Sequence, residues 1–338
     1  MIAHEDTQKD FYDGILEKMV CQDHAYRKIK KAVDFGTLVK PLEKLYSKNG
    51  TKGEPIERGF KCLLIQYWED LSDRQLERYA RENMAMRWFC GYKLDETTPD
   101  HSYFGKLRKR IGLKELSKLF NRIVKDLEEA GYVGNIFHFV DASSFFSKVN
   151  LWEARDRAIK DRENNEKDEA GNKKMNNKNV SKYSSDKEAK FGCKGKKKFW
   201  FGYKRHVRVD MRNGIITKTA ATSADIPDAK AFVEEELCPD QGMVFLDKGY
   251  DSNSVSEEIE QNNCANATIQ KINKKTKNKD LDRWRSGVRM PYENVFRNLR
   301  KTARYRGKPK VEFQITFEAI AYNLKRLIKI HEGGLVIA

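Results

Sequence analysis

The sequence predicts an α+β protein in which a helical N-terminal region precedes a mixed β-sheet flanked by helices. Two observations predict this class. Up to about Gly131 the apolar residues recur at helical spacing, whereas from Gly134 onward short, β-rich apolar runs alternate with helical segments. We therefore expect a helical domain over residues 1–131 and a sheet-containing domain over residues 132–338.

The composition limits the classes of function. The chain has 338 residues, enough for two domains with cores of their own. It has 66 Lys and Arg against 50 Asp and Glu, and the net charge of +16 favours a polyanionic partner such as nucleic acid. No apolar stretch approaches the roughly 20 residues that span a bilayer, and no hydrophobic signal segment opens the sequence. We therefore expect a cytoplasmic protein that does not associate with a membrane. The six scattered cysteines form no C-x-x-C pair, which argues against a disulfide framework or a zinc site.

The helical region contains a helix-turn-helix pattern. An apolar helix is expected from about Gly59 to Trp68, and Ser72 is followed three residues later by Gln75, the pattern of a capping box that begins a second helix. Further along, Thr98 is a candidate N-cap with Pro99 at the first helical position, and a glycine at 112 closes that helix. An amphipathic stripe then continues to Gly131, and it predicts a helix that packs on a core: Leu113, Leu116, Phe120, Ile123, Val124 and Leu127.

The second half predicts five strands with helices between them. Strands are expected over 135–146, 199–210, 214–224, 243–247 and 266–272, and helices over 228–237, 254–263, 291–307 and 313–330. Asn213 and Gly214 predict the hairpin between the second and third strands. A polar, Lys-rich stretch at about 150–198 is too poor in apolar residues to fold alone, so we interpret it as an insertion after the first strand.

Three acidic residues stand at positions that suit a shared site. Asp141 lies within or just after the first strand, and Asp247 ends the apolar run of the fourth strand. Glu293 follows Pro291 at the expected start of a helix, where Arg297 and Arg300 would share its face as a basic ridge. Each acid has a structural alternative, because an Asp can cap a turn and a Glu in the first helical turn suits the helix dipole.

Several segments of the sequence, taken in their order along the chain, resemble those of a known family, the bacterial insertion-sequence DDE transposases of the IS-four and IS-five kind. The resemblance covers most of the chain and rests on LSDRQL, TTPDHSYFGKLRKRIG, FVDASSF, FLDKGYDS and RMPYENVFRNLRK. The family signature places Tyr, Arg, Glu and Lys with two, three and six residues between them. Arg289 and Glu293 match it, Arg300 with the adjacent Lys301 stands at the Lys position, and Ser286 replaces the Tyr.

The resemblance implies a fold, a reaction and a metal. The strand order is that of a ribonuclease H-like five-stranded mixed sheet. Asp141, Asp247 and Glu293 would be the catalytic and metal-binding triad, holding two Mg²⁺ ions, with Mn²⁺ as a substitute; carboxylate oxygens suit such ions. The implied reaction is cleavage of DNA at the ends of a mobile element, followed by transfer of the 3′-hydroxyl end into target DNA.

The resemblance also implies DNA as the partner: double-stranded terminal inverted repeats and target DNA, bound by a homodimer. The residues expected to contact DNA near the acids are Lys204, His206, Lys248, Tyr250, Arg289, Arg297, Arg300 and Lys301. For Lys204 and His206, which share one strand face, a solvated strand edge is an equal alternative. Asp228 is either a fourth acid of the site or an acid at a helix N-terminus. In the helical region, recognition of the terminal repeats is suggested by four arginines: Arg74, Arg78, Arg81 and Arg87.

Two other functions fit the same residues. A different ribonuclease H-like nuclease would cut DNA without joining strands. A catalytically inactive relative would only bind DNA, and the departure at Ser286 agrees with that alternative. The ability to join a 3′-hydroxyl end to a second DNA molecule separates these hypotheses.

Overall fold

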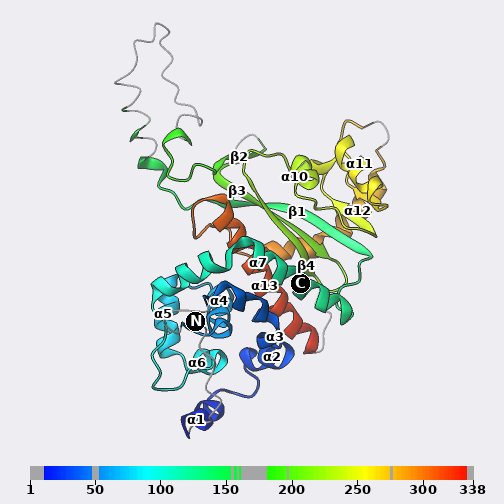
Figure 1. The fold of residues 1–338 in the computed structure, drawn as a ribbon. Helices are drawn as coiled ribbons and strands as arrows, with labels where there is room; N and C mark the ends of the chain where they lie inside the picture. Colours follow the sequence, from blue (N-terminus) through cyan, green and yellow to red (C-terminus); the bar gives the residue numbers. More distant parts are fainter. Residues whose placement is uncertain are drawn as a thin grey trace. The chain divides into compact units, whose positions relative to one another are not determined.

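The structure is a computed structural model that describes residues 11–47, 53–153, 156–157, 160, 181–195, 198–274 and 277–332 (Figure 1). The chain divides into two compact units. One comprises the residues up to Asp126 together with the stretch from Thr316 onward, and the other runs from Leu127 to Ile315. None of the helices in the described part of the chain combines the length and the apolar composition that a membrane crossing requires.

The first unit is helical. Its elements are α1 (Phe11–Met19), α2 (Ala25–Ala32), α3 (Phe35–Val39), the 3₁₀ helix η1 (Lys40–Leu45), α4 (Ile56–Trp68), α5 (Asp73–Glu82), α6 (Met84–Cys90) and most of α7 (His101–Glu129). Helix α4 is buried along almost its whole length. Phe317, near the middle of α13 (Lys308–His331), packs on it, with ring centroids 5.2 Å from Phe60 and 4.9 Å from Tyr67. The core of this unit therefore includes residues from both ends of the described chain.

The expected helix signals of this unit are largely confirmed. The predicted helix at 59–68 is α4, and the capping box is present at the start of α5: the Gln75 N–H donates to Ser72 Oγ and the Ser72 N–H donates to Gln75 Oε1. Gly112 interrupts α7 with φ 66°, a conformation that glycine adopts without steric cost. The predicted cap at Thr98 is wrong, because Asp100 accepts from the amides of Ser102 and Tyr103 and α7 begins after it.

The second unit contains a mixed sheet with the order β2-β3-β1-β5-β6, in which β4 also pairs with β3. The strands are β1 (Phe137–Phe146), β2 (Lys190–Lys194), β3 (Lys198–Asp210), β4 (Ile215–Ser223), β5 (Met243–Leu246) and β6 (Ala265–Thr268). β1 is antiparallel to β3 and parallel to β5, and β5 is parallel to β6. The α+β class is confirmed, and the pairing of β1 with β5 makes neighbours of the strands that carry or precede the first two acids.

The number of strands differs from the prediction. The described sheet has six strands instead of five, because β2 forms inside the stretch predicted to be an insertion. Its one large apolar side chain, Phe191, packs on Phe201 of β3 with ring centroids 5.0 Å apart, and this contact stabilises a strand that its Lys-rich sequence does not predict. The rest of the predicted insertion is described only in small part, and residues 161–180 lie outside the described residues.

Helices cover both faces of this sheet. On one face, Val140, Val244 and Leu246 form a core with residues of α10 (Asp228–Glu234) and α11 (Asn253–Gln261), which lie next to each other in Figure 1. On the other face, Phe145 and Tyr203 pack with the first residues of α13. Because helices pack on both faces, polar side chains of β3 such as Arg205 and His206 are buried and need partners inside the protein.

Candidate active site

Two of the predicted acids lie at the same level of neighbouring parallel strands. The register between β1 and β5 pairs Phe137 with Met243 and Phe139 with Phe245. Continuing this register by two residues places Asp141 opposite Asp247. Asp247 follows the last residue of β5 and caps the short 3₁₀ helix η2 (Lys248–Tyr250) by accepting from the Lys248 N–H at 2.7 Å. β1 continues beyond this level, so Asp141 lies beside the point where β5 ends.

The third acid comes from a helix that the sequence did not predict. Glu293 is the last residue of α12 (Lys279–Glu293) and is followed by the 3₁₀ helix η3 (Asn294–Asn298). The prediction that Pro291 begins a helix is wrong: α12 begins at the N-cap Asn278, whose side chain accepts from the amides of Asp280 and Leu281, and Pro291 lies in its last turn. Because the helix ends at Glu293, the proposed helical ridge of Arg297 and Arg300 does not form.

Aromatic contacts hold α12 against the sheet. Trp284 packs on Phe245 of β5 with ring centroids 5.8 Å apart, and Tyr292 packs near Phe139 of β1 at 6.4 Å. The Tyr292 hydroxyl also donates to the carbonyl of Met211. Since Phe139 and Asp141 are two residues apart on β1, they share one face of the strand, and α12 lies over that face.

Arg289 stands at the centre of the three acids. Its Nη1 lies 3.5 Å from Asp247 Oδ1, and its Nη2 lies 3.7 Å from Asp141 Oδ2 and 3.5 Å from Glu293 Oε1. The guanidinium carbon lies 5.4 Å from the ring centroid of Phe139, and the residue is only 4% exposed. Three carboxylates from distant parts of the sequence are thus gathered around one cation.

The three carboxylate side chains differ in their exposure to solvent. The side chain of Asp141 is 23% exposed, that of Asp247 44% and that of Glu293 58%. Removal from water is the main cause that raises the pKa of Asp141 to about 6, and it outweighs the stabilising amide of Ala142 and the guanidinium of Arg289. Charge repulsion from Asp247 and Asp228 raises it further. Asp141 therefore lies where a further cation would be favourable.

The donor set fits a hard divalent cation. Mg²⁺ and Mn²⁺ prefer carboxylate oxygens, and three carboxylates with one guanidinium leave a formal charge of −3 + 1 = −2. Within the part of the chain that the structure describes, however, no three His, Cys, Asp or Glu side chains are close enough to hold a metal ion together. The carboxylates are arranged around the guanidinium, not around a common empty point.

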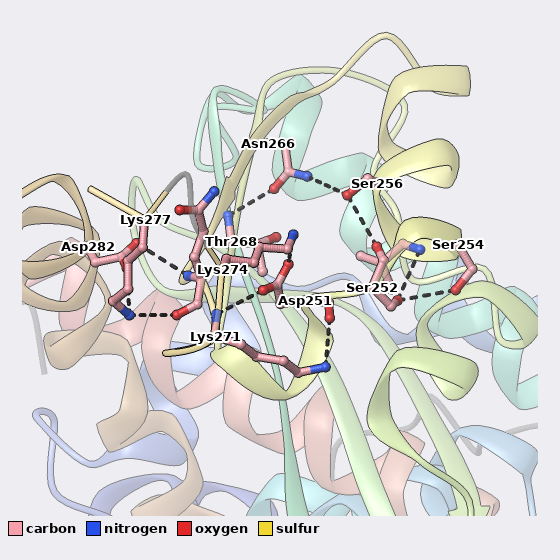
Figure 2. A network of polar contacts seen from close by, with 12 residues as sticks. Asp251, Ser252, Ser254, Ser256, Asn266, Thr268, Lys271, Lys274, Lys277 and Asp282 are labelled. Atoms are coloured by element: carbon pink, nitrogen blue, oxygen red, sulfur yellow. Dashed lines mark hydrogen bonds and ion pairs between the residues drawn. The ribbon is translucent and has the colours of Figure 1, made fainter. Parts of the chain in front are cut away.

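A polar network ties the strand that carries Asp247 to the helix that carries Arg289 (Figure 2). Asp251, which follows η2, accepts from the amide of Lys271 at 2.8 Å and from Lys274 Nζ at 2.5 Å, and its own carbonyl accepts from Lys271 Nζ. In the first turn of α12, Asp282 Oδ2 lies 3.1 Å from Lys277 Nζ. The connection from β6 to α12 is therefore fixed near both of its ends.

Three of the residues predicted to contact DNA lie inside the protein. Tyr250 is 1% exposed and packs edge-on against Phe232, with ring centroids 6.0 Å apart. His206 is fully buried, and its Nε2 lies 2.8 Å from Thr222 Oγ1. Arg289 is buried among the acids, as described above. A direct contact with DNA requires an exposed side chain, so we no longer expect one from these three residues.

Lys204 is also placed differently from the expectation. Asp141 is paired with Val207 across β1 and β3, so the alternation of side chains puts Lys204 and His206 on the opposite face of the sheet. Lys204 Nζ donates to the Ile226 carbonyl at 2.7 Å and to Asp228 Oδ1 at 2.8 Å. The Lys204 ammonium group is therefore paired with Asp228 within the protein.

Asp228 satisfies both interpretations that the sequence left open. It is the first residue of α10, as an acid at a helix N-terminus should be. Its Oδ2 also lies 3.9 Å from the position that a Cβ on Gly249 would occupy, two residues after Asp247 in sequence, and its charge contributes to the raised pKa of Asp141. Asp228 is thus a fourth acid near the site, paired with Lys204.

The remaining residues predicted to contact DNA are accessible. Lys248 directly follows Asp247 and is exposed, as are Arg297 and Lys301, and Arg300 is half-buried. Arg297 is 3.4 Å from the side-chain oxygen of Asn294, and Arg300 Nε donates to Thr302 Oγ1 at 3.0 Å. These cations lie on segments that directly follow Asp247 or Glu293 in sequence.

The central position of Arg289 was missed by sequence reasoning, although a signal existed. Arg289 precedes Glu293 by four residues, the spacing at which two side chains meet on one helix face. Recognising it required α12 to be identified as a helix. The Asn278 cap followed by Asp280 and Asp282 in the first turn was the available evidence for that helix.

Two family models match the chain. Residues 15–110 match the model described as "Transposase domain (DUF772)", and residues 171–324 match the model described as "Transposase DDE domain". The second range contains Asp247, Arg289 and Glu293, whereas Asp141 precedes it. Neither description specifies a family of insertion sequences. No solved structure matches the chain.

Proposed function

Because the chain belongs to the insertion-sequence DDE transposases, which act on DNA, we propose that it cleaves DNA strands and joins the resulting 3′-hydroxyl ends to target DNA. Asp141, Asp247 and Glu293 would form the active site for both steps. The observation that carries this proposal is the meeting of three carboxylates around Arg289 where β5 ends. The carboxylates come from β1, from the residue after β5 and from the end of α12. Such convergence is what a metal-dependent phosphoryl transfer site requires.

We assign the three acids to one metal site. Asp141, the least exposed, and the more exposed Asp247 and Glu293 would supply the carboxylate oxygens that hold a divalent cation. We expect two Mg²⁺ ions at this site, with Mn²⁺ as a substitute. When bound, they would activate the attacking water or 3′-hydroxyl and stabilise the leaving oxygen. Lys248 and the exposed cations after Glu293 would hold the phosphates on either side of the reacting bond.

The helical unit offers a surface for the element ends. Arg74, Arg78 and Arg81 follow one another on one face of α5 and line a shallow cavity of about 500 Å³, together with Gln75, Glu77 and His101. We propose that this arginine row contacts the backbone of terminal repeat DNA. Arg87, which the sequence grouped with these residues, is instead buried and donates to backbone carbonyls, including that of Glu96 at 2.6 Å.

The remaining parts of the proposal concern assembly and location. We predict a helical DNA-end-binding and dimerisation domain over 1–131 and a catalytic domain over 132–338, and we propose these two roles for the two compact units, with the stretch from Thr316 onward assigned to the helical unit instead of the catalytic one. Joining two element ends in one event needs two active sites, so a homodimer is the simplest assembly. The enzyme would act in the cytoplasm, where bacterial DNA is accessible.

The test is a cleavage and strand-transfer assay with the full-length protein. Labelled duplexes that carry the element ends are incubated with Mg²⁺ or Mn²⁺ and an unlabelled target. We expect wild-type protein to cut at the element end and to join the 3′ end to the target, and we expect Asp247→Asn and Glu293→Gln to remove both activities while DNA is still bound.

Asp280→Asn is the matched control, because Asp280 is an exposed acid of the same helix as Glu293. Cleavage without joining would favour a nuclease of the same fold. Unchanged cleavage in either triad variant would contradict the assignment of that residue.

A further inference from the structure

We propose that Arg289 holds the place of the metal: its guanidinium neutralises and positions the three carboxylates while no cation is bound, and it leaves their centre when a divalent cation binds. This inference rests on the proposed function of Asp141, Asp247 and Glu293. It gives Arg289 the role of a positioning residue instead of a DNA contact.

The geometry is that of an ion surrounded by counter-ions. The guanidinium nitrogens lie 3.5–3.7 Å from one oxygen of each carboxylate. These separations exceed the usual 2.7–3.2 Å of N–H···O hydrogen bonds, so the attraction is electrostatic and only weakly directional. A divalent cation at the same position would attract the same three groups by the same force.

Neither the arginine nor the carboxylates would be stable in this place alone. A buried guanidinium without counter-ions is strongly unfavourable, and Arg289 is 4% exposed. Three carboxylates drawn together without a cation repel one another. The formal charge of the site is −2 with Arg289 present and becomes more negative, −3, without it. Arg289 therefore reduces, but does not remove, the attraction of the site for a divalent cation.

The contacts of Arg289 are those of a residue that can move. Its buried Nε has no hydrogen-bond partner among the described residues, and its other recorded contact is the face of Phe139. Arg87 shows the contrast: this buried arginine donates to the carbonyls of Ala80, Arg81, Lys93 and Glu96. Arg87 is fixed to the backbone through several directional bonds, whereas Arg289 is held by the charges that a metal would take over.

Guanidinium and metal exclude each other at the centre. Mg²⁺ binds its oxygen ligands at about 2.0–2.1 Å, much closer than the present distances between Arg289 and the carboxylate oxygens. The carboxylates must therefore move inward when an ion binds. The space between them is then too small for a guanidinium, so the side chain has to leave the centre.

The experiment measures metal binding without DNA and without turnover. Full-length wild-type protein, Arg289→Gln and Arg289→Lys are titrated with Mn²⁺, and free Mn²⁺ is followed by electron paramagnetic resonance. We expect Arg289→Gln to bind Mn²⁺ about tenfold more tightly, because no cation competes for the carboxylates. Arg289→Lys, which keeps the charge, should stay closer to wild type. Arg283→Gln removes the same charge from an exposed position of α12 and should not change the affinity.

Melting temperatures provide a second measurement. Without metal, Arg289→Gln should unfold at a lower temperature than wild type, and Mn²⁺ should raise its melting temperature more than that of wild type. If Arg289→Gln is folded but binds Mn²⁺ equally or less tightly than wild type, the placeholder role is overturned while the proposed function stands. If wild-type protein binds no Mn²⁺ even at millimolar concentrations, the metal-dependent function itself is overturned.

A measurement on wild-type protein covers the case in which Arg289→Gln does not fold. With ¹⁵N-labelled arginine, the Nε–Hε signal of Arg289 is identified by its absence in Arg289→Lys. Addition of Mg²⁺ should shift this signal, since the side chain leaves the carboxylates. A signal that Mg²⁺ does not shift, at concentrations where Mn²⁺ binding to the same protein is observed, would contradict the displacement.

Discussion

At the scale of single residues, burial changes what an ionisable side chain can do. His206 was expected to contact phosphate, yet it lies fully buried with Thr222 as its partner at Nε2 and no partner at Nδ1 among the described residues. Removal from water lowers the pKa of His206 to about 4. The residue is thus neutral in the folded protein at physiological pH and contributes to the core of the sheet.

This burial predicts an acid-dependent stability. The folded state keeps His206 neutral down to about pH 4, whereas the unfolded chain takes up a proton near pH 6.5, so the stabilisation is complete above pH 6.5 and is lost as the pH falls toward 4. We expect the unfolding free energy of His206→Gln to fall less than that of wild type as the pH is lowered over this range. The difference between the two losses should reach about 3 kcal/mol at pH 4. Denaturant unfolding between pH 7.5 and 4.5 measures it. His331→Gln, at an exposed position, is the control, and parallel curves for wild type and His206→Gln would refute the explanation.

At the scale of elements, the candidate site depends on where α12 lies. Its sequence has no regular apolar stripe, and its large apolar residues are only partly covered: Leu281 and Met290 are exposed, and Trp284 packs on Phe245 while it stays about half exposed. The helix is instead specified by the Asn278 cap and is held in place by contacts with distant residues. The cap that begins this helix is a local signal, whereas the contacts that place the helix against the sheet come from residues distant in sequence.

The network around Asp251 predicts the effect of loosening this connection. Asp251→Asn removes the carboxylate that Lys271 and Lys274 bind, and it leaves a buried amide in its place. We expect the free energy of unfolding to fall by about 1–3 kcal/mol, with weaker cleavage because α12 is less well positioned. Thermal unfolding and the cleavage assay measure both effects. Asp280→Asn is the matched control on the exposed side of α12, and equal behaviour of the two variants would mean that the network does not support the site.

The capping box of α5 predicts a smaller effect in the helical unit. Ser72→Ala removes the oxygen that accepts from the Gln75 N–H at the start of the helix that carries the arginine row. We expect a loss of about 1 kcal/mol in unfolding free energy. Denaturant unfolding checks this, with Ser102→Ala, an exposed position at the start of a helix capped by Asp100, as the comparison. A larger loss in Ser102→Ala would contradict the importance of the box.

At the scale of the whole molecule, the net charge of +16 governs how DNA is bound. Each cation that neutralises a phosphate releases counter-ions, so the logarithm of the affinity should fall linearly with the logarithm of salt concentration. We expect Arg78→Gln, in the arginine row of α5, to weaken binding and to reduce this slope by about one. Titrations of labelled element-end DNA at several salt concentrations measure the slope. Arg283→Gln, an exposed arginine away from the row, should leave it unchanged, and equal slopes for all three proteins would exclude the row as a phosphate contact.

The sequence by itself determined the α+β class, the helical first half, the hairpin at Asn213 and Gly214, and the strands that carry Asp141 and Asp247, because each of these depends on short-range periodicity and turn chemistry. Only the tertiary structure decided that Arg289 stands among the three acids, that Tyr250 and His206 are buried, and that Lys204 faces away from Asp141. These facts depend on which distant segments pack together. Packing over long sequence distances decides whether a charged side chain meets solvent, a counter-ion or the core, and no local pattern contains that information.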